Sequence, residues 1–461
     1  MKNLTIKSVA EAVGGTYYGD ESFESQEISM ITIDSRKIEK NGLFIAVKGE
    51  RSDGHDYIKG CLDNGAIAVI SEHVIEDEKR PVIVVESSLK ALRDLAAFYR
   101  SQLDIKVVGI TGSVGKTSTK ETIASVLATK YQVLKTAGNF NNEIGLPLTV
   151  FRLTEADEVA VLEMGISDFG EMSRLTAIAR PDISVITNIG QCHLENLGTR
   201  DGILKAKTEI FEGMNADGIA VLNADDDKLI TIDSVCGKKP VHFGIDKKSG
   251  IYAKDIKSKG LLGTDAMLCN VPCADGINEF PISISVPGAH MVYNAMAAAA
   301  VGALLGLTSA QIAKGIADMN TIAGRNHIIK TTHFVILDDC YNANPVSMKS
   351  SIDVVALATG RKVCILGDMF ELGSDEAKLH NEVGQYLAGR NIDVLMTAGK
   401  LSYNIAEGAR QAGASTKVYS FDTRDELIAK LPEVLKDGDN ILVKASHGME
   451  YTAIVKYLEE Y

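Results

Sequence analysis

The sequence has little of what marks a nucleic-acid-binding, secreted or membrane protein. Its 461 residues carry 48 basic and 61 acidic side chains, a formal net charge of −13. No basic tract is interleaved with aromatic residues, which argues against a nucleic acid as the main partner. Residues 1–8 lack the apolar core of a secretory signal, and the longest apolar run, 295–307, is shorter than the ~20 residues that span a bilayer. We therefore expect a cytoplasmic protein without membrane insertion, and a buried helix at 295–307.

Cysteine is irregularly placed. Of the seven cysteines, only Cys269 and Cys273 lie close together in the sequence. No second pair completes a zinc site, and an odd number of scattered thiols is typical of a reducing cytosol. The chain is also too long for a single hydrophobic core, so we expect about two to four domains.

The most informative segment is 107–119, Val-Val-Gly-Ile-Thr-Gly-Ser-Val-Gly-Lys-Thr-Ser-Thr. An apolar strand-like run enters a glycine-rich turn, which brings Lys116 and Thr117 to the start of a helix-forming segment. Loop N–H groups, the helix N-terminus, the lysine charge and the threonine hydroxyl together suit a nucleoside triphosphate and Mg²⁺. We expect ATP to bind along Thr111, Gly112, Ser113, Val114, Gly115, Lys116 and Thr117.

The loop departs from the common Walker pattern at one position. That pattern has a glycine five residues before Gly115, where this chain has Ile110, so the local form is T-G-x-x-G-K-T. A glycine-rich turn with a solvated lysine would explain the glycines alone. It would not explain a strand, a turn, a Lys-Thr pair and a helix in that order.

Hydrophobic patterning divides the chain into three α/β regions, with a helix at 89–103 between the first two. Alternating strands and helices in the second and third regions predict parallel sheets, and 250–287 breaks the rhythm as a small antiparallel insertion. We expect a small α/β N-terminal domain at 1–85, a central P-loop ATPase domain at 86–320 and a Rossmann-like C-terminal domain at 321–461. Ligands should bind in the crevice at the carboxyl ends of the strands.

The predicted strands of the three regions are 29–33, 43–47, 66–70 and 82–85; then 106–110, 132–135, 159–164, 183–188, 219–223 and 241–243; then 334–338, 363–367, 394–398, 418–421 and 441–444.

Polar side chains follow several central strands. Glu163 ends one strand and His193 follows another, so both should lie near Thr117 at the carboxyl edge of the sheet. Glu163 could instead cap a helix, and a lone histidine is more often a satisfied polar residue than a ligand. The convergence of three such positions favours a metal site.

Other polar motifs have simpler alternative explanations. The amide-rich segment 139–147 favours turns, although amides also donate to ligand oxygens. His290 and Asn294 share one face of a helix and could contact a nucleotide or only solvent. Polar groups at 338–345 follow a strand and could bind ribose hydroxyls or cap the next helix.

Two basic positions are equally ambiguous from spacing alone. Lys205 and Lys207 lie on different sides of a predicted helix, and two solvated lysines would explain them. Arg325 precedes the third region, where it could reach a phosphate from a hinge or remain in solvent.

Taken together, these residues resemble the ATP-dependent Mur ligases. The resemblance rests on 111–117, Glu163, His193, the pair His290 and Asn294, and Arg325. Three further strings are similar to family members that join D-alanyl-D-alanine to UDP-N-acetylmuramoyl-tripeptide: Asn-Phe-Asn-Asn-Glu at 139–143, Asp-Asp-Cys-Tyr-Asn-Ala-Asn-Pro at 338–345 and Gly-Asp-Met-Phe-Glu-Leu-Gly at 367–373. The resemblance covers all three regions.

The resemblance implies a catalytic role for Lys116, Glu163, His193 and Lys207. Lys116 and the loop N–H groups would hold the ATP phosphates, Thr117 and Glu163 would bind one Mg²⁺, and His193 would bind a second. Lys207 matches a family lysine that is often carbamylated, which makes it a carboxylate-like Mg²⁺ ligand. The remaining ATP contacts would be Asn294 to adenine, Arg325 to a phosphate and Asp339 to the ribose.

The resemblance also implies the substrates. Segments 34–36 and 52–55 resemble those that meet the UDP-sugar peptide, which gives Ser35, Arg36, Asp53 and His55 as substrate-binding candidates beside Asn139 and Asn142. The expected partners are UDP-N-acetylmuramoyl-tripeptide and D-alanyl-D-alanine, and the expected assembly is a monomer. The reaction would form an amide through an acyl phosphate, in the synthesis of cytoplasmic peptidoglycan precursors.

Two positions depart from the family pattern: His447 stands where arginine is usual, and Cys340 where serine is usual. Neither removes a group that the chemistry requires. A ligase for an earlier stem amino acid or a folylpolyglutamate synthetase would share the central domain, but the strings at 338–345 and 367–373 argue against both. A P-loop switch or motor would hydrolyse ATP without either substrate.

Overall fold

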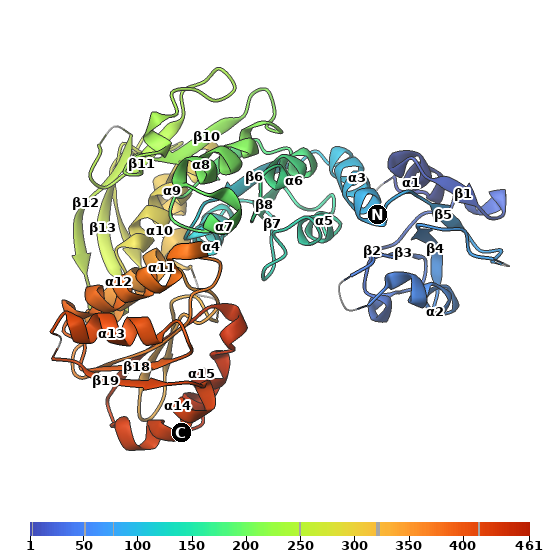
Figure 1. Ribbon diagram of the computed structural model, residues 1–461. Helices are drawn as coiled ribbons and strands as arrows, with labels where there is room; N and C mark the ends of the chain where they lie inside the picture. Colours follow the sequence, from blue (N-terminus) through green and yellow to red (C-terminus); the bar gives the residue numbers. More distant parts are fainter. Residues whose placement is uncertain (2, 50–51, 77, 249, 320–322, 414) are drawn as a thin grey trace.

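The computed structural model describes residues 1, 3–49, 52–76, 78–248, 250–319, 323–413 and 415–461, which form three sheets in three successive units of the chain. The N-terminal unit stands apart on one side of the central unit, and the C-terminal unit packs against another side (Figure 1). The predicted three-part α/β architecture is confirmed.

The N-terminal unit holds a five-stranded sheet in the order β1-β5-β4-β3-β2. Its helix α1 begins with a capping box in which the side chains of Thr5 and Ser8 each accept the other's backbone N–H. Strand β1 pairs antiparallel with β5 and was not among the predicted strands, because three residues are too few to show a period. The elements are α1 (Ile6–Val13), β1 (Thr16–Tyr18), β2 (Ile31–Thr32), β3 (Gly42–Ile45), α2 (Ile58–Asp63), β4 (Ala66–Ser71) and β5 (Val82–Val84).

The central unit holds a nine-stranded sheet in the order β14-β13-β12-β11-β10-β9-β6-β8-β7. Along this order, each pair of neighbouring strands from β11 to β7 is parallel, as near-continuous apolar runs predict, and β12 is parallel to β11. The predicted antiparallel segment at 250–287 forms, but its strands continue the central sheet instead of standing apart as an insertion. The strands are β6 (Lys106–Thr111), β7 (Val133–Lys135), β8 (Val159–Glu163), β9 (Ile183–Ile186), β10 (Ile219–Asn223), β11 (Val241–Gly244), β12 (Ile251–Ser258), β13 (Thr264–Cys269) and β14 (Phe280–Ile284).

Helices cover both faces of the central sheet. The Ala-rich helix α9 and helix α4 pack together in one hydrophobic core with β6, β8 and β12, so the longest apolar run is a buried helix, as predicted. The helices are α4 (Lys116–Leu127), α5 (Gly145–Val150), α6 (Glu171–Ala179), α7 (Leu194–Leu197), α8 (Arg200–Thr208), α9 (His290–Leu304) and α10 (Ser309–Ala317). No helix among the described residues is long and apolar enough to cross a membrane.

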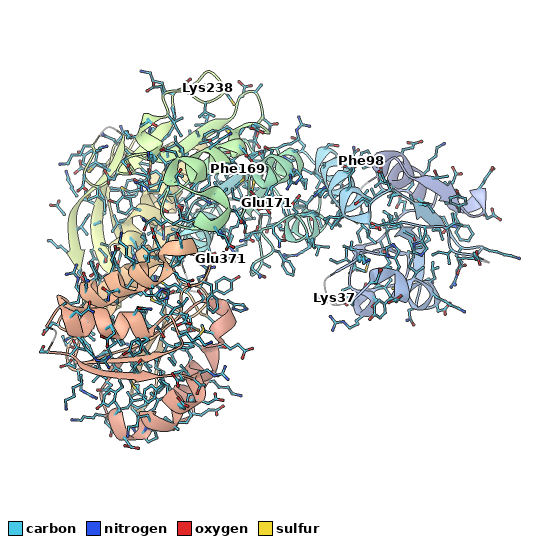
Figure 2. The ribbon with its side chains drawn as sticks, in the orientation of Figure 1. Lys37, Phe98, Phe169, Glu171, Lys238 and Glu371 are labelled. Carbon is cyan, nitrogen blue, oxygen red and sulfur yellow. The ribbon has the colours of Figure 1, made fainter. Side chains whose placement is uncertain are left out.

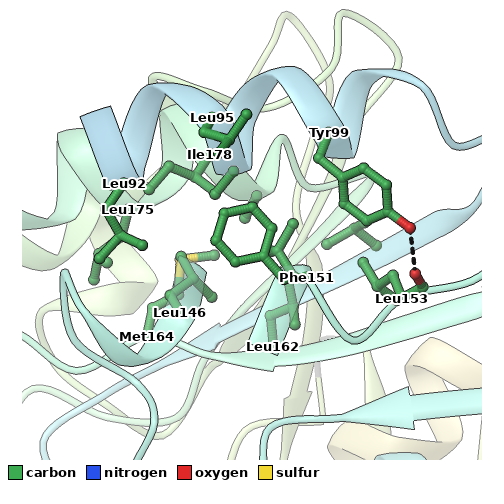
Figure 3. Close-up of a cluster of buried hydrophobic side chains, with 14 of the residues drawn as sticks. Leu92, Leu95, Tyr99, Leu146, Phe151, Leu153, Leu162, Met164, Leu175 and Ile178 are labelled. Carbon is green, nitrogen blue, oxygen red and sulfur yellow. Dashed lines mark hydrogen bonds between the residues drawn. The ribbon is translucent and has the colours of Figure 1, made fainter. Parts of the chain in front are cut away.

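Helix α3 (Ser88–Ser101) joins the N-terminal unit to the central one. It contacts α1 and β4 on one side and α5 and α6 on the other. Leu92, Leu95 and Tyr99 bury their side chains among central residues such as Phe151, and the Tyr99 hydroxyl donates to the Leu153 carbonyl (2.7 Å; Figure 3). One continuous core therefore anchors the N-terminal unit.

The C-terminal unit holds a six-stranded sheet in the order β15-β16-β20-β17-β18-β19, parallel except for β15. The side chain of Asn344 accepts the Ser347 N–H and Pro345 occupies the first turn of α11, so the capping explanation of that string holds. The elements are β15 (His327–Lys330), β16 (Val335–Asp338), α11 (Pro345–Ala356), β17 (Lys362–Gly367), α12 (Glu376–Ala388), β18 (Val394–Ala398), α13 (Tyr403–Gln411), β19 (Lys417–Phe421), α14 (Arg424–Val434), β20 (Asn440–Lys444) and α15 (Thr452–Glu459).

The C-terminal unit meets the central one through polar and apolar contacts. His290, at the start of α9, bonds through its two ring nitrogens to Asn326 (2.8 Å) and to Ser350 on α11 (3.0 Å). Leu261, between β12 and β13, packs against the core of the C-terminal unit. The predicted boundary at 320–321 lies outside the described residues.

Candidate active site

The phosphate loop occupies the turn between β6 and α4, where two glycines are required. Gly112 has φ +148°, and a Cβ there would lie 1.9 Å from the Thr187 hydroxyl oxygen. Gly115 has φ +84° and is the N-cap of α4, without a side-chain capping bond. The N-terminus of α4 is therefore left for an anionic ligand rather than for a protein cap.

The segment after β9 fixes the shape of this loop. Ser113 N–H donates to the Asn188 carbonyl and Val114 N–H to the Asn188 side chain, both at 3.0 Å. The Thr187 hydroxyl donates to the Val114 carbonyl (2.6 Å). The N–H groups of Ser113 and Val114 are therefore used inside the protein and are not free to bind a phosphate.

Lys116 lies folded over the loop. Its ammonium donates to the Gly112 carbonyl (2.7 Å). Burial lowers the pKa of Lys116, neighbouring Cys192 and Glu163 act in the opposite direction, and Arg325 adds to the lowering. Lys116, Glu163 and Arg325 thus lie close enough to influence one another electrostatically.

Glu163 ends β8 and is 1% exposed. Its Oε1 accepts from the Thr117 hydroxyl (3.2 Å) and from the Asn141 amide (2.9 Å). Its Oε2 has no hydrogen-bond partner among the described residues, and the nearest cation, the Lys120 ammonium, is 3.7 Å away. A buried carboxylate oxygen without a donor is an unfavourable arrangement that a bound cation would relieve.

Asn141, which supplies one of those donors, was not among the predicted site residues. The prediction named Asn139 and Asn142 from the same string, because a sequence does not show which amide of a turn points inward. The Asn142 side chain accepts the N–H groups of Ile144 and Gly145, and so stabilises the start of α5. A substrate role for Asn139 and Asn142 stays a prediction.

His193 lies at the carboxyl edge of the same sheet, just before α7, with φ +51°. Burial and the nearby charges of Lys116 and Lys207 lower its pKa to about 4. The imidazole is therefore neutral at physiological pH, which is the form that binds metals. Its Nδ1 lies 2.9 Å from Oε2 of Glu371 in the C-terminal unit.

Lys207 on α8 is 1% exposed and has no hydrogen-bond or ion-pair partner within the described part of the chain. Burial lowers the pKa of Lys207 to about 8, and Lys116 adds to the lowering. The alternative of a solvated lysine is wrong for Lys207. Lys205, in contrast, is exposed to solvent, and its ammonium lies 5.6 Å from the centre of the Phe169 ring.

Asn294 projects from α9 toward the phosphate loop. Its carbonyl oxygen accepts from the Thr119 hydroxyl (2.9 Å) and lies 3.7 Å from where a Cβ on Gly115 would stand. Asn294 is thus beside the start of α4, although it is 6% exposed and already bonded within the protein.

The C-terminal unit contributes Arg325 and Tyr341 to the same region. The Arg325 guanidinium lies 4.1 Å from the centre of the Tyr341 ring. Burial raises the pKa of Tyr341, with Arg325, Glu163 and Asn139 as further neighbours, so this tyrosine faces the central site. Sequence analysis assigned it no role, because nothing in the string at 338–345 separates it from its neighbours.

Asp339 is engaged inside the protein. Its carboxylate accepts from the buried Lys444 ammonium (2.5 Å) and from the Ser351 hydroxyl (2.6 Å), and from the Asn326 N–H (3.1 Å). These bonds order the loop after β16 next to Arg325. A ribose contact by Asp339 stays a prediction.

The candidates in the N-terminal unit form two local motifs. Asp34 caps a short helical turn and binds the guanidinium of Arg36 through two bonds, at 2.8 and 2.9 Å. Asp53 caps a second short helical turn, and its carboxylate lies 2.6 Å from Nδ1 of His55. Ser35 lies within the first turn. None of these residues contacts the phosphate loop among the described interactions, so they form a separate part of the candidate site.

The metal-binding candidates are a mixed donor set. No group of three or more His, Cys, Asp or Glu side chains suited to a metal occurs in the described ranges. Thr117, Glu163 and His193 offer a hydroxyl, a carboxylate and an imidazole instead, and leave positions for phosphate oxygens. That composition fits Mg²⁺, which binds proteins through one or two carboxylates and completes its shell with phosphates and water.

Comparison with known proteins gives matches along the whole chain. Residues 27–100 match the description "Mur ligase family, catalytic domain", 110–302 "Mur ligase middle domain" and 324–447 "Mur ligase, glutamate ligase domain". The UDP-N-acetylmuramoyl-tripeptide–D-alanyl-D-alanine ligase of Bacillus subtilis is 40% identical over 465 residues, covering 100% of this chain and 99% of its own. The Escherichia coli protein of the same name is 32% identical over 462 residues, with coverage of 100% and 99%.

Solved structures agree. A crystal structure of MurF from Acinetobacter baumannii superposes with a TM-score of 0.90 at 30% identity and covers 99% of both chains. The MurF ligase of Thermotoga maritima, solved in complex with ADP, gives a TM-score of 0.82 at 32% identity, covering 94% of this chain and 97% of its own.

Proposed function

The chain belongs to the Mur ligase family, and on that premise we propose that it joins D-alanyl-D-alanine to UDP-N-acetylmuramoyl-tripeptide at the expense of ATP. It is an ATP-dependent ligase of peptidoglycan synthesis. One observation carries this conclusion: full-length similarity to such ligases coincides with a site in which a phosphate loop meets a buried, partly unsatisfied carboxylate, Glu163.

ATP binds at the phosphate loop, and the residues around it have distinct roles in the proposal. The start of α4 and the Lys116 ammonium hold the phosphates, and Arg325 reaches them from the C-terminal unit. The position of Asn294 beside the loop supports a contact with the nucleotide. Cations held around the transferred phosphoryl group stabilise the negative charge that its oxygens carry in the transition state.

The donors at the sheet edge fit Mg²⁺. Thr117 and Glu163 would hold one ion and His193 another, and the lack of a hydrogen-bond donor to Oε2 of Glu163 supports this assignment. Mg²⁺ bound there would offset the negative charge of the phosphates. Asn141 and Thr117 hold Glu163 in place by donating to its other oxygen.

Lys207 would complete the site as a carbamate. A neutral lysine amine adds to CO₂, forming an N–C bond and releasing one proton, so that an ammonium becomes an anionic oxygen ligand. The lowered pKa of Lys207, about 8, supports this step because a larger share of the amine is neutral. Its burial without a partner also supports it, because an unpaired buried ammonium is unfavourable.

The chemistry follows from the poor reactivity of a carboxylate. Its oxygen attacks the γ-phosphorus of ATP, the bond to the bridging oxygen breaks, and ADP leaves with an acyl phosphate formed on the tripeptide. The free amine of D-alanyl-D-alanine then attacks the acyl carbon, and the tetrahedral intermediate releases phosphate and one proton. Every group needed is a ligand or a positioning side chain, so no enzyme nucleophile takes part.

Each of the three predicted domains has its own role in the proposed reaction. The domain at 1–85 would bind the UDP-sugar peptide through Ser35, Arg36, Asp53 and His55, and Asn139 and Asn142 would contact the substrate from the domain at 86–320. The domain at 321–461 would close over ATP and exclude water, which would otherwise hydrolyse the acyl phosphate. The protein would act as a monomer.

The test is phosphate release from ATP with each substrate omitted in turn. If the protein is this ligase, phosphate release requires both UDP-N-acetylmuramoyl-tripeptide and D-alanyl-D-alanine, and one amide product forms per phosphate released. Equal release without either substrate would contradict the proposal and favour a P-loop switch or motor. Phosphate release with a single amino acid in place of the dipeptide would instead favour one of the rival ligases.

A further inference from the structure

Lys444 is a buried lysine at the carboxyl end of β20, and the proposed reaction gives it no role. Its side chain is 2% exposed, and it pairs in register with Leu366 of β17. Figure 2 shows Glu371, which follows β17, at the edge of the C-terminal unit that faces the central one. Lys444 therefore lies at the end of the C-terminal sheet that faces the candidate active site.

The Lys444 ammonium holds the loop after β16 on both sides of Tyr341. It donates to the Asp339 carboxylate (2.5 Å), to the Asp339 carbonyl (3.2 Å) and to the Asn342 carbonyl (3.0 Å). These three acceptors match the three N–H groups of an ammonium, which leaves no donor for a ligand. Lys444 therefore fixes the loop that carries Tyr341 and does not itself bind the nucleotide.

The same loop holds the segment that carries Arg325. The Tyr341 N–H donates to the Gly324 carbonyl (3.1 Å), and the Asn326 N–H donates to the Asp339 carboxylate (3.1 Å). Arg325 lies between these two bonded residues in the chain, and its guanidinium lies 4.1 Å from the centre of the Tyr341 ring. The position of Arg325 therefore depends on the loop that Lys444 holds.

This hydrogen-bond network extends to the central unit. The Asn326 side chain bonds to Nε2 of His290, at the start of α9 (2.8 Å). Because the Asn326 N–H also binds Asp339, an unbroken series of hydrogen bonds runs from Lys444 to the central unit. The segment 324–326 is thus held from two sides, by Lys444 through Asp339 and by His290 through Asn326.

We propose that Lys444 is a positioning residue that sets Arg325 and Tyr341 for ATP without touching the nucleotide. This inference rests on the proposed function, because that function gives Arg325 its phosphate. A guanidinium donates to phosphate oxygens in a fixed fork, so a displacement of about 1 Å weakens its contribution strongly. Without the ammonium, the Asp339 carboxylate would be a buried charge without its cation, and the loop would have to move to return it to water.

The test is the set of kinetic constants of Lys444→Met, which loses all three donors and keeps a long side chain. The value of kcat/KM for ATP should fall by about 10- to 100-fold. KM for UDP-N-acetylmuramoyl-tripeptide should not change, because its proposed contacts lie in the domains at 1–85 and 86–320. Lys362→Met is the matched control and should leave both values unchanged. Lys362 is a buried lysine at the opposite end of the same sheet, where it donates to the Gly360 carbonyl (3.1 Å).

A double-mutant cycle separates action through Arg325 from a general loss of stability. In an Arg325→Ala background, Lys444→Met should cause a much smaller further loss of kcat/KM for ATP than it does in the parent. Should Lys444→Met fail to fold, Ser351→Ala takes its place, because the Ser351 hydroxyl donates to the same carboxylate of Asp339 (2.6 Å).

Two results would overturn the inference and leave the proposed function intact. One is an unchanged kcat/KM for ATP in the folded single variant, and the other is fully additive losses in the double variant. A parent enzyme that releases phosphate without either peptide substrate would overturn the proposed function instead.

Discussion

Lys207 offers the sharpest quantitative prediction of the account, because its burial fixes the pH range in which it reacts with CO₂. With a pKa of about 8, roughly a quarter of the amine is neutral at pH 7.5, against about one part in a thousand for an ordinary lysine. Only the neutral amine adds to CO₂. The rate of carbamylation should therefore rise about tenfold per pH unit below pH 8 and level off above it.

The assay starts from enzyme stripped of bicarbonate at low pH. Activity should return when CO₂ is added, with the rate-against-pH profile described above, and ¹³CO₂ should give a carbamate carbon signal by NMR. A recovery rate that keeps rising to pH 10 would show that Lys207 has an ordinary pKa. Full activity without CO₂ and no carbamate signal would refute the carbamate.

Substitution provides the matching control within the same helix. Lys207→Ala should lose at least about 100-fold in kcat, as expected for a group that holds a metal, and recover part of it with added short carboxylates. Lys205→Ala should retain nearly full activity, because Lys205 is exposed. A Lys207→Ala variant as active as the parent would make Lys207 a structural residue only.

Three further substitutions test the loop and the core. Lys116→Ala should lower kcat by about 10²–10³-fold in the ligase assay while circular dichroism stays unchanged, and full activity would remove the phosphate-loop assignment. Gly112→Ala should abolish ATP binding by calorimetry, because its Cβ would lie 1.9 Å from Thr187, whereas Gly60→Ala, with nothing within 4 Å, should bind normally. Tyr99→Phe should lower the free energy of unfolding by about 1–2 kcal/mol in urea melts, because it leaves a buried carbonyl without its donor. If Tyr99→Phe left the free energy of unfolding unchanged, the role of α3 in anchoring the N-terminal unit to the central one would be contradicted.

The parts of the fold with a clear period were predictable from the sequence. Long apolar runs such as 106–110 and 219–223 become buried parallel strands, and the Ala-rich segment becomes α9. Strands β1 and β15 were missed because each is short, pairs antiparallel and ends a sheet, so that neither shows continuous burial. The pairing of β12 with β11 depends on sheet register, which no local pattern encodes.

The site was predictable where a side chain follows a strand within one sheet. Glu163 and Thr117 meet for that reason. Contacts across units were not predictable, because they depend on how separate folds are juxtaposed. The pair of His193 and Glu371 is of this kind, and so is the approach of Tyr341 to the central site.

The direction in which a side chain points from an irregular loop could not be predicted from the sequence either. The string at 139–143 holds three asparagines, and the structure turns Asn141 toward Glu163 while Asn142 bonds to the backbone of the next helix. Asp339 shows the same limit, since its bond to Lys444 joins positions 105 residues apart. Composition and spacing cannot separate these cases.

The central claim is that ATP activates a carboxylate instead of being hydrolysed by water. The most direct measurement uses tripeptide substrate whose reacting carboxylate carries ¹⁸O, followed by mass spectrometry of the released phosphate. Attack of that carboxylate on ATP predicts that one labelled oxygen passes to each phosphate and the other stays in the new amide. Unlabelled phosphate would show that water attacked ATP, and would contradict the acyl-phosphate account.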